Sequence, residues 1–266
     1  LKFSSPNGCA SNAGTGAVTT GLWVSDAGNN KIKRIAVSAD IASRVVTSIA
    51  EQVWGSATAG DVAGTATTTR FSGLVGVFRD ALPASAVVDT VVTVDANGFK
   101  SITSGTGSAT NGLNAGGAGS FLHSCIKNTE YYCSDKARHV IWKIVATTGV
   151  TNVFSGTQNN AGVVAGVAGT GRLNTPTHLA LQGSNIFVYS SGANSFQKVD
   201  NTGTITLVDA TSYPSQCTAS TVGQIAAAAT ADVLFVACGS VVAKNFAGTW
   251  TCVVGASSNC ATSGTL

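Results

Sequence analysis

The sequence predicts an all-β fold built from about five repeated units, and three observations carry this prediction. One hairpin pattern recurs along the 266 residues, Gly is abundant with 31 residues, and no stretch of useful length has the apolar period of a helix. Hydrophobic residues make up 44% of the chain and charged residues 10%. This is enough apolar surface for a buried core and too little charge for a disordered polyelectrolyte.

The clearest hairpin lies in residues 21–35, GLWVSDAGNNKIKRI. Its first strand ends at Asp26, a turn follows at residues 27–30, and a second strand carries Ile32 and Ile35. Asp, Gly and Asn favour this turn because they bond to neighbouring backbone groups or tolerate left-handed dihedral angles. The β-branched and aromatic residues on either side predict two half-buried strands.

Four further hairpins repeat this pattern, at residues 92–102, 131–144, 187–199 and 234–246. The position of Asp26 is taken in turn by Asp95, Asp135, Ser190 and Cys238. These equivalent positions are separated by 69, 40, 55 and 48 residues. Such spacings are typical of the blades of a β-propeller, so the sequence predicts five blades of four antiparallel strands each.

A second motif precedes the hairpins. Lys2-Phe3-Ser4-Ser5-Pro6 matches Arg172-Leu173-Asn174-Thr175-Pro176, and looser versions begin at Arg70 and Ser120. In both motifs the chain resembles the NHL-repeat β-propellers, whose unit reads roughly RF-x-x-P-x-G, an apolar strand, and LYV-x-D-x-x-N-H-x-I. The resemblance covers nearly the whole chain and is specific in units one, three and four. It implies a single propeller domain over residues 1–266.

The predicted units follow one another without a linker. They cover residues 1–69, 74–119, 123–171, 173–220 and 225–266. The ambiguous stretch 41–54 is interpreted as containing an outer strand at 45–49. The chain ends at the phase where Lys2-Phe3 would come next, so we expect the termini to close the ring and remove its exposed sheet edge. The alternative to five blades is six, the usual number in NHL-type propellers.

Cysteine spacing predicts disulfides. Seven Cys in a chain of such low charge favour an oxidising compartment. Cys125 and Cys133 flank a short turn, and Cys252 and Cys260 flank residues 255–259 in the same manner, so we predict both pairs as disulfides. Within unit five we predict Cys217–Cys238 as a further pair. Cys9 is then left over, either free or bonded to another chain.

Several features bear on location. The chain begins at Leu1 and contains no Met, which suggests a processed product whose signal peptide has been removed. It contains no run of 18 apolar residues, so we expect no transmembrane segment. We expect an extracellular or cell-surface protein delivered by the secretory pathway, with O-linked sugar as a further expectation for the Thr-rich loops.

The net charge of +3 is too small and too scattered to predict nucleic-acid binding. The one basic cluster is interpreted as a solvated strand face and consists of Lys31, Lys33, Arg34 and Arg44. The Gly-rich loops 105–119 and 161–171 are interpreted as connectors. Neither stands between a strand and a helical pattern, as a phosphate-binding loop would.

Three His are the candidate metal ligands. His139 falls on the turn position of the repeat, and His123 and His178 come just before inner strands. In a propeller these two positions lie on the same face, near the Asp series. The resemblance supplies a precedent, because NHL-type propellers that act as amidating lyases hold zinc with His from several blades.

The residues themselves favour no site. Only His123 and His178 share the inner-strand position, whereas catalytic zinc needs three protein ligands beside an open position. Locally bonded turn residues account for His139 and the Asp series. We therefore predict no catalytic residue, no metal and no cofactor.

Two functions are consistent with these observations. The first is a non-catalytic extracellular scaffold that binds other extracellular proteins, glycans or copies of itself, and no nucleic acid. The loops at 55–69, 104–120 and 156–171 vary between units and would carry its recognition. The alternative is a metal-dependent lyase or hydrolase of the amidating-lyase type.

Overall fold

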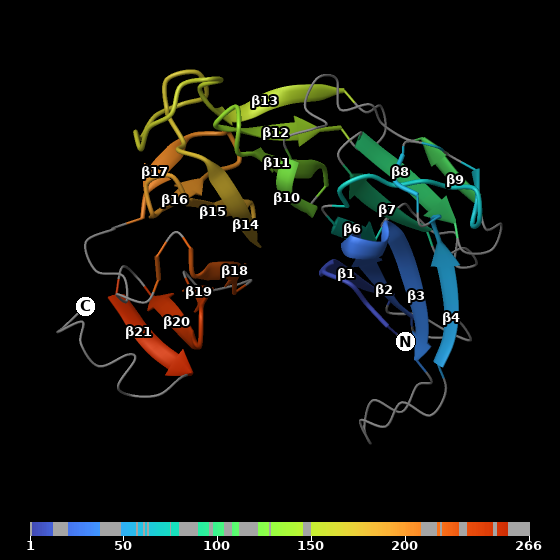
Figure 1. Ribbon diagram of the computed structural model, residues 1–266. Coiled ribbons are helices and arrows are strands. Elements are labelled where there is room, and N and C mark those ends of the chain that lie inside the picture. Colours follow the sequence, from blue (N-terminus) through green and yellow to red (C-terminus); the bar gives the residue numbers. More distant parts are fainter. Residues whose placement is uncertain are drawn as a thin grey trace. The chain divides into compact units, whose positions relative to one another are not determined.

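The strands of the computed structural model form antiparallel sheets (Figure 1). The structure describes residues 2–12, 21–37, 49–56, 58–60, 62, 64–74, 76–79, 90–95, 98–103, 108–111, 122–127, 129–145, 150–208, 217–218, 220–228, 233–246 and 249–254. These residues contain 21 strands in five sheets and one short 3-10 turn, η1 (Ala27–Asn29). The predicted all-β class is therefore confirmed.

The chain divides into two compact units, of which the first comprises residues 1–122 and 147–150. One sheet of this unit has the order β1 (Pro6–Asn12), β2 (Gly21–Asp26), β3 (Lys31–Val37), β4 (Ile49–Trp54). The other has the order β5 (Gly64–Thr65), β9 (Ser108–Asn111), β8 (Gly98–Thr103), β7 (Thr90–Asp95), β6 (Gly76–Arg79).

The second compact unit comprises residues 123–146 and 151–266 and holds three sheets. They are β10 (Leu122–Lys127), β11 (Tyr131–Asp135), β12 (Val140–Ile144), β13 (Thr151–Gly156); β14 (Pro176–Gln182), β15 (Asn185–Ser190), β16 (Ser195–Val199), β17 (Ile205–Leu207); and β18 (Val222–Ala227), β19 (Val233–Cys238), β20 (Val241–Phe246), β21 (Thr249–Val254). In each sheet, consecutive strands are neighbours, as in a propeller blade.

The predicted hairpins are present in register. Asp26 pairs with Lys31, Asp135 with Val140, and Ser190 with Ser195, so three hairpins share one turn length. The predicted outer strand at 45–49 is misplaced, because β4 runs from Ile49 to Trp54 and residues 45–48 lie outside the described part of the chain. The C-terminal end of β4 is stabilised by Trp54, because its indole is buried against Trp23 with the ring centroids 4.9 Å apart.

Neighbouring sheets within each unit share a core. In the first unit Trp23 and Trp54 pack with Phe71, Leu74 and Val77, which lead into or lie in the next sheet. In the second unit one cluster joins the β14–β17 sheet to the β18–β21 sheet, and Phe196 lies 5.3 Å from Trp250 between ring centroids. Burial of apolar side chains between consecutive sheets is what makes each repeat depend on its neighbour.

Two of the loops that were predicted to differ between units, those at 55–69 and 156–171, have the same structure over their C-terminal parts. Residues 60–71 and 162–173, which we call the capping loops, share the pattern G-x-V-A-G-x-A-x-T-x-R. In each loop the first Gly donates its N–H to the carbonyl of the last residue at 3.1 Å, Gly60 to Phe71 and Gly162 to Leu173. The prediction that the loops at 55–69 and 156–171 differ is therefore wrong, whereas most of the third predicted loop, 104–120, lies outside the described residues.

The capping loops explain the unequal sheets. The first capping loop adds β5 to the outer edge of β9, and in the second Gly166 exchanges two backbone hydrogen bonds with Ile205 of β17, at 3.0 and 2.8 Å. A loop that pairs with an outer strand blocks that edge from pairing with another chain. Four sheets thus have the predicted four strands. The fifth sheet has five, because the first capping loop contributes β5 as an additional strand beside β9.

Two predicted disulfides are present, Cys125–Cys133 and Cys217–Cys238. Cys252 is also disulfide-bonded, while Cys260, its predicted partner, lies outside the described residues. Cys9 is free and exposed. Among the described residues, no helix has the length and apolar character needed to cross a membrane. The single-domain assignment and the closure of a ring by the termini stay predictions.

Candidate functional site

The residues of the Asp series and His139 lie where the second strand of a sheet turns into the third. His123 and His178, predicted just before inner strands, lie instead within β10 and β14.

In the first sheet the turn between the second and third strands is organised by Asp26, whose side chain is fully buried. Its Oδ1 accepts the N–H of Ser4 at 2.7 Å, and its Oδ2 accepts Asn29 Nδ2 at 2.8 Å and lies 3.1 Å from Lys33 Nζ. Burial opposes ionisation of Asp26, but the bonds from Asn29, Ser4 and Lys33 outweigh it and lower its pKa.

The lowered pKa of Asp26 predicts a loss of stability in acid. A carboxyl group whose pKa is lower in the folded state than in the unfolded state stabilises the protein at any pH above its ordinary pKa of 3.8. This contribution disappears as the pH falls through the folded-state pKa. At neutral pH, Asp26→Asn should lower the free energy of unfolding by about 2 kcal/mol. Urea unfolding of both proteins from neutral pH to below 3.8 should show this difference shrinking. A difference that stays constant with pH would mean that the Asp26 charge does not stabilise the fold.

The basic cluster is not the solvated face that the sequence suggested. Lys33 and Arg34 are only 7% and 9% exposed. Lys33 Nζ also donates to the carbonyl of Lys2 and lies 4.8 Å from the centre of the Phe3 ring, so this cation is used inside the fold. Arg34 lies against Trp23, its strand partner, at 5.9 Å from the ring centre. Arg44 lies outside the described residues.

The same cross-strand pairing of an aromatic with a basic residue recurs in four sheets and was missed in the sequence. The pairs are Trp23 with Arg34, Tyr132 with Lys143, Phe187 with Lys198, and Phe235 with Lys244. Each aromatic residue stands three positions before the residue equivalent to Asp26, so the repeat spacing itself was a usable signal. In two of these pairs the cation lies over the ring of its partner: Arg34 Cζ is 5.9 Å from the centre of Trp23, and Lys198 Nζ is 5.8 Å from the centre of Phe187. Lys244 Nζ instead lies 5.6 Å from the ring of Phe246. Packing of a basic side chain on an aromatic ring thus accounts for the first two pairs.

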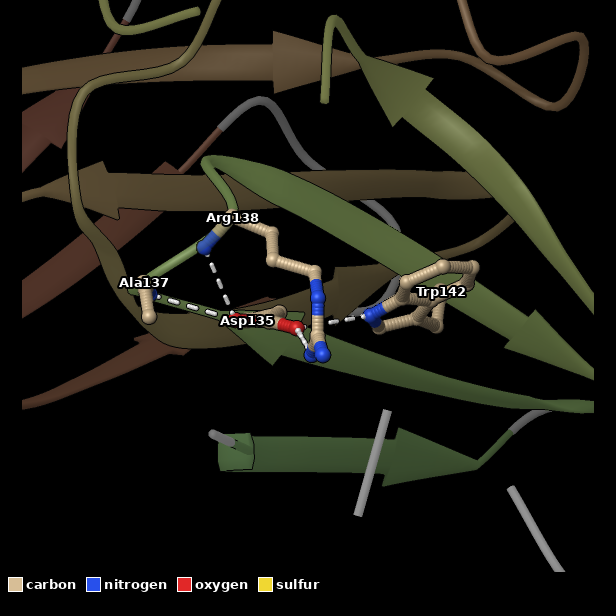
Figure 2. Close-up of polar contacts among 4 residues, drawn as sticks. All are labelled: Asp135, Ala137, Arg138 and Trp142. Carbon is tan, nitrogen blue, oxygen red and sulfur yellow. Dashed lines mark hydrogen bonds and ion pairs between the residues drawn. The ribbon is translucent and has the colours of Figure 1, made fainter. Parts of the chain in front are cut away.

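Asp135 holds the turn of the third repeat (Figure 2). Its Oδ1 accepts the backbone N–H groups of Ala137 and Arg138 at 3.1 and 3.0 Å. Its Oδ2 accepts Arg138 Nη1 at 2.9 Å and Trp142 Nε1 at 3.0 Å. Figure 2 shows these four donors converging on one carboxylate. With its lone pairs occupied by the turn, this fully buried carboxylate is a structural acceptor.

Ser190 performs the same task without a charge. Its hydroxyl is 2.7 Å from Gln197 Oε1, and the Gln197 amide in turn donates to the carbonyl of Arg172 at 2.9 Å. Gln197 stands seven residues after Ser190, as Trp142 stands after Asp135 and Lys33 after Asp26. Each hairpin therefore joins these two positions by a polar contact, and the residue types at both ends change together.

His139 is also a turn residue. Its φ of 62° lies in the left-handed region, as do those of Asn30 at 52° and Asn194 at 47°, the equivalent residues of two other hairpins. Asn and His are enriched in this region among non-Gly residues. The Nδ1 atom of His139 accepts the backbone N–H of Thr175 at 3.0 Å. Since Thr175 enters the next sheet, the imidazole ties two sheets of the second compact unit together.

This arrangement predicts how substitutions of His139 differ. His139→Asn keeps a side chain suited to positive φ and loses the bond to Thr175, so we expect a loss of about 1 kcal/mol in the free energy of unfolding. His139→Val adds a β-branched side chain to the left-handed region, which should cost about 1–2 kcal/mol more. Urea unfolding of the two variants measures the difference. Equal losses would mean that the backbone conformation of His139 is unimportant.

The remaining candidates do not converge on a metal centre among the described residues. His178 is half-buried on β14, and its Nδ1 lies 3.1 Å from the hydroxyl of Thr177. His123 belongs to β10 and Asp95 to β7, but their side chains are not among those described. Within the described part of the chain, no three His, Cys, Asp or Glu side chains are grouped as metal ligands.

No protein-family model matches the chain, and no curated protein matches it in sequence. Solved structures do match it. An auxiliary nutrient binding protein from Bacteroides thetaiotaomicron is 11% identical with a TM-score of 0.59, over 89% of this chain and 57% of that one. The chain thus spans little more than half the length of that protein.

Two further structures match over most of this chain. A catalytically inactive virginiamycin B lyase from Staphylococcus aureus, solved with quinupristin, is 13% identical with a TM-score of 0.58, over 96% of this chain and 73% of that one. A chain of a nidogen/laminin complex is 11% identical with a TM-score of 0.58, over 97% and 82%. At this low identity the likeness establishes the fold alone, and that fold is the β-propeller.

Proposed function

We propose that this chain is a non-catalytic, extracellular propeller that acts as a scaffold and binds other extracellular proteins, glycans or copies of itself. The observation that carries the proposal is the engagement of its reactive side chains in the fold. Asp26, Asp135 and His139 each hold a hairpin turn or an entry into a strand with their polar atoms. Groups that fix the backbone in this way supply rigidity, and rigidity suits a scaffold that presents loops.

The capping loops are the recognition surface in this proposal. Arg70 and Arg172 are exposed at equivalent positions, and the Cδ atom of each would lie 3.0 Å from a Cβ built on Gly60 or Gly162. Each Arg stem is thus laid over a glycine, which orders the guanidinium group. Exposed Val62 and Val164 lie in the strand partner position to these arginines. Arg beside apolar surface is a common feature of protein interfaces.

An extracellular location is part of the same proposal. Cys125–Cys133 and Cys217–Cys238 support it, because disulfides persist in oxidising compartments. The arrangement of the sheets as blades of one ring, closed by its termini, also belongs to the proposal. The match to one chain of a nidogen/laminin complex over 97% of this chain is consistent with a binding role.

The second candidate is an enzyme of the lyase type, favoured by the match to the virginiamycin B lyase. Such an enzyme would depend on a metal held by His123 and His178. This candidate makes separate claims, namely stoichiometric bound metal and turnover of a substrate.

Two sets of assays on the purified chain, one for binding and one for catalysis, decide between the candidates. Sedimentation over a wide concentration range and a glycan array test binding, with the Arg70→Ala/Arg172→Ala double variant beside Lys136→Ala, which changes an exposed cation outside the capping loops. We expect self-association or glycan binding that is weakened only in the double variant. Metal analysis and incubation with quinupristin, followed by mass spectrometry, test the enzyme. Stoichiometric zinc or conversion of quinupristin that is lost in His178→Ala would overturn the scaffold function.

A further inference from the structure

In the last sheet a disulfide ties the entering segment to the end of the second strand, where two other sheets use a hydrogen bond. Cys238 ends β19 at the position equivalent to Asp26 and Ser190, and its sulfur is bonded to Cys217, which precedes β18. Both cysteines are buried, at 2% and 1% exposure. The disulfide therefore joins the segment that enters the first strand to the end of the second strand.

Two other sheets make this connection without a covalent bond. In the first sheet the N–H of Ser4, two residues before β1, donates to Asp26 Oδ1 at 2.7 Å. In the β14–β17 sheet the N–H of Asn174, two residues before β14, points to the Ser190 hydroxyl at 3.4 Å. In both sheets a polar side chain at the end of the second strand holds the entering segment.

The register of the strands supports the equivalence of Asp26, Ser190 and Cys238, although Cys217 stands five residues before β18 and not two. Pro6 pairs with Asp26, Pro176 with Ser190, and Val222 with Cys238, and in each sheet the pairing then shifts by one residue. The backbone agrees as well. Gly239 donates to the carbonyl of Thr221 at 2.9 Å, as Ser191 donates to the carbonyl of Thr175 at 3.0 Å.

We propose that Cys217–Cys238 is a redox-sensitive clasp that replaces the polar tie of the other repeats, so that its reduction releases the segment entering β18 and opens the last sheet locally. Besides the disulfide and the bond from Gly239, the described part of this segment has hydrogen bonds within its own turn. Thr218 accepts the N–H of Val222 at 3.1 Å through its carbonyl, and its own N–H is bonded to the Thr221 hydroxyl at 2.8 Å. Breaking the disulfide leaves the turn intact but removes its covalent link to β19.

The chemistry requires a reductant from outside, and a small dithiol suffices. One thiolate of the dithiol attacks a sulfur of the Cys217–Cys238 bond and forms a mixed disulfide, and its second thiol then displaces the protein. The dithiol becomes a cyclic disulfide, and two electrons and two protons pass to the two cysteine thiols. Since both sulfurs are buried, the reaction follows local opening of the segment and is slower than reduction of an exposed disulfide.

The repeats themselves supply the control for an experiment. Cys217→Ser/Cys238→Ser removes the clasp, and Cys217→Ser/Cys238→Asp introduces the acceptor that the first sheet has in Asp26. Cys125→Ser/Cys133→Ser removes a disulfide that joins β10 to β11 and serves as the matched control. Peptide-resolved hydrogen exchange of the folded proteins measures the opening of each sheet separately.

We expect Cys217→Ser/Cys238→Ser to raise exchange in residues 217–228 on the order of tenfold, with no change in β14–β17. The Asp variant should recover most of this protection, and the control should leave residues 217–228 unchanged. Dithiol treatment of the folded wild type should give the same local increase, so the result does not depend on folding of the variants. Unchanged exchange in residues 217–228, an equal increase in all sheets, or an Asp variant identical to the Ser variant would overturn the clasp.

Discussion

Replacement of Gly203 by Ala is expected to lower the free energy of unfolding by at least about 3 kcal/mol. Gly203 lies in the turn between β16 and β17 with a φ of 88°, and a Cβ built there would overlap the backbone carbonyl oxygen of Phe154 on β13. The same glycine accepts the Ser155 hydroxyl through its carbonyl at 2.9 Å. The clash therefore lies between the backbones of two sheets, neither of which can rotate away.

Gly169 provides the matched control. Its φ of 86° is nearly that of Gly203, but a Cβ there would have no atom within 4 Å. Gly169→Ala therefore carries only the cost of the left-handed backbone, about 1 kcal/mol. Urea unfolding of both variants separates the two contributions. Equal losses at the two positions would show that the sheets are not packed as closely at Gly203 as the structure has them.

Loss of the Asp135 carboxylate should have an effect of similar size. Asp135→Ala removes four hydrogen-bond contacts and leaves the indole N–H of buried Trp142 without its acceptor, so we expect a loss of about 3–4 kcal/mol in the free energy of unfolding. Near-ultraviolet circular dichroism should change together with stability because Trp142 loses its fixed environment. Chemical unfolding monitored at both wavelength ranges measures the two effects.

Asp200→Ala is the comparison for Asp135→Ala. Asp200 also accepts backbone and hydroxyl groups of its own turn, from Thr202 and Thr204. These bonds, with that of Thr202 first, lower the pKa of Asp200. Asn201 and Thr202 are exposed and the bonds between Thr202 and Asp200 face solvent, so water replaces the lost acceptor there and we expect a much smaller loss. If Asp200→Ala lowered the free energy of unfolding as much as Asp135→Ala, burial of the carboxylate would not be what makes Asp135 important.

The sequence by itself determined the repeat. The spacing of Asp26, Asp95, Asp135 and Ser190 predicted four hairpins, and Cys238 marked a fifth despite the loss of the polar residue. These predictions succeeded because turn chemistry and the alternation of strands are local properties, set by a few consecutive residues. The Cys125–Cys133 disulfide could be predicted for the same reason, because a short turn between two strands brings the two cysteines opposite each other.

Only the tertiary structure decided how these side chains are used. The sequence predicted a solvated face for Lys33 and Arg34, but the fold buries them against Asp26 and Trp23. His139 finds its partner at Thr175, 36 residues away, and the capping loops find theirs on the outer strand of a following sheet. Such contacts join segments distant in the chain, and their formation depends on how sheets pack, which no local pattern of residues encodes. The repeat can therefore be predicted from the sequence. The hydrogen-bond partner of each polar side chain is decided only when the sheets pack together.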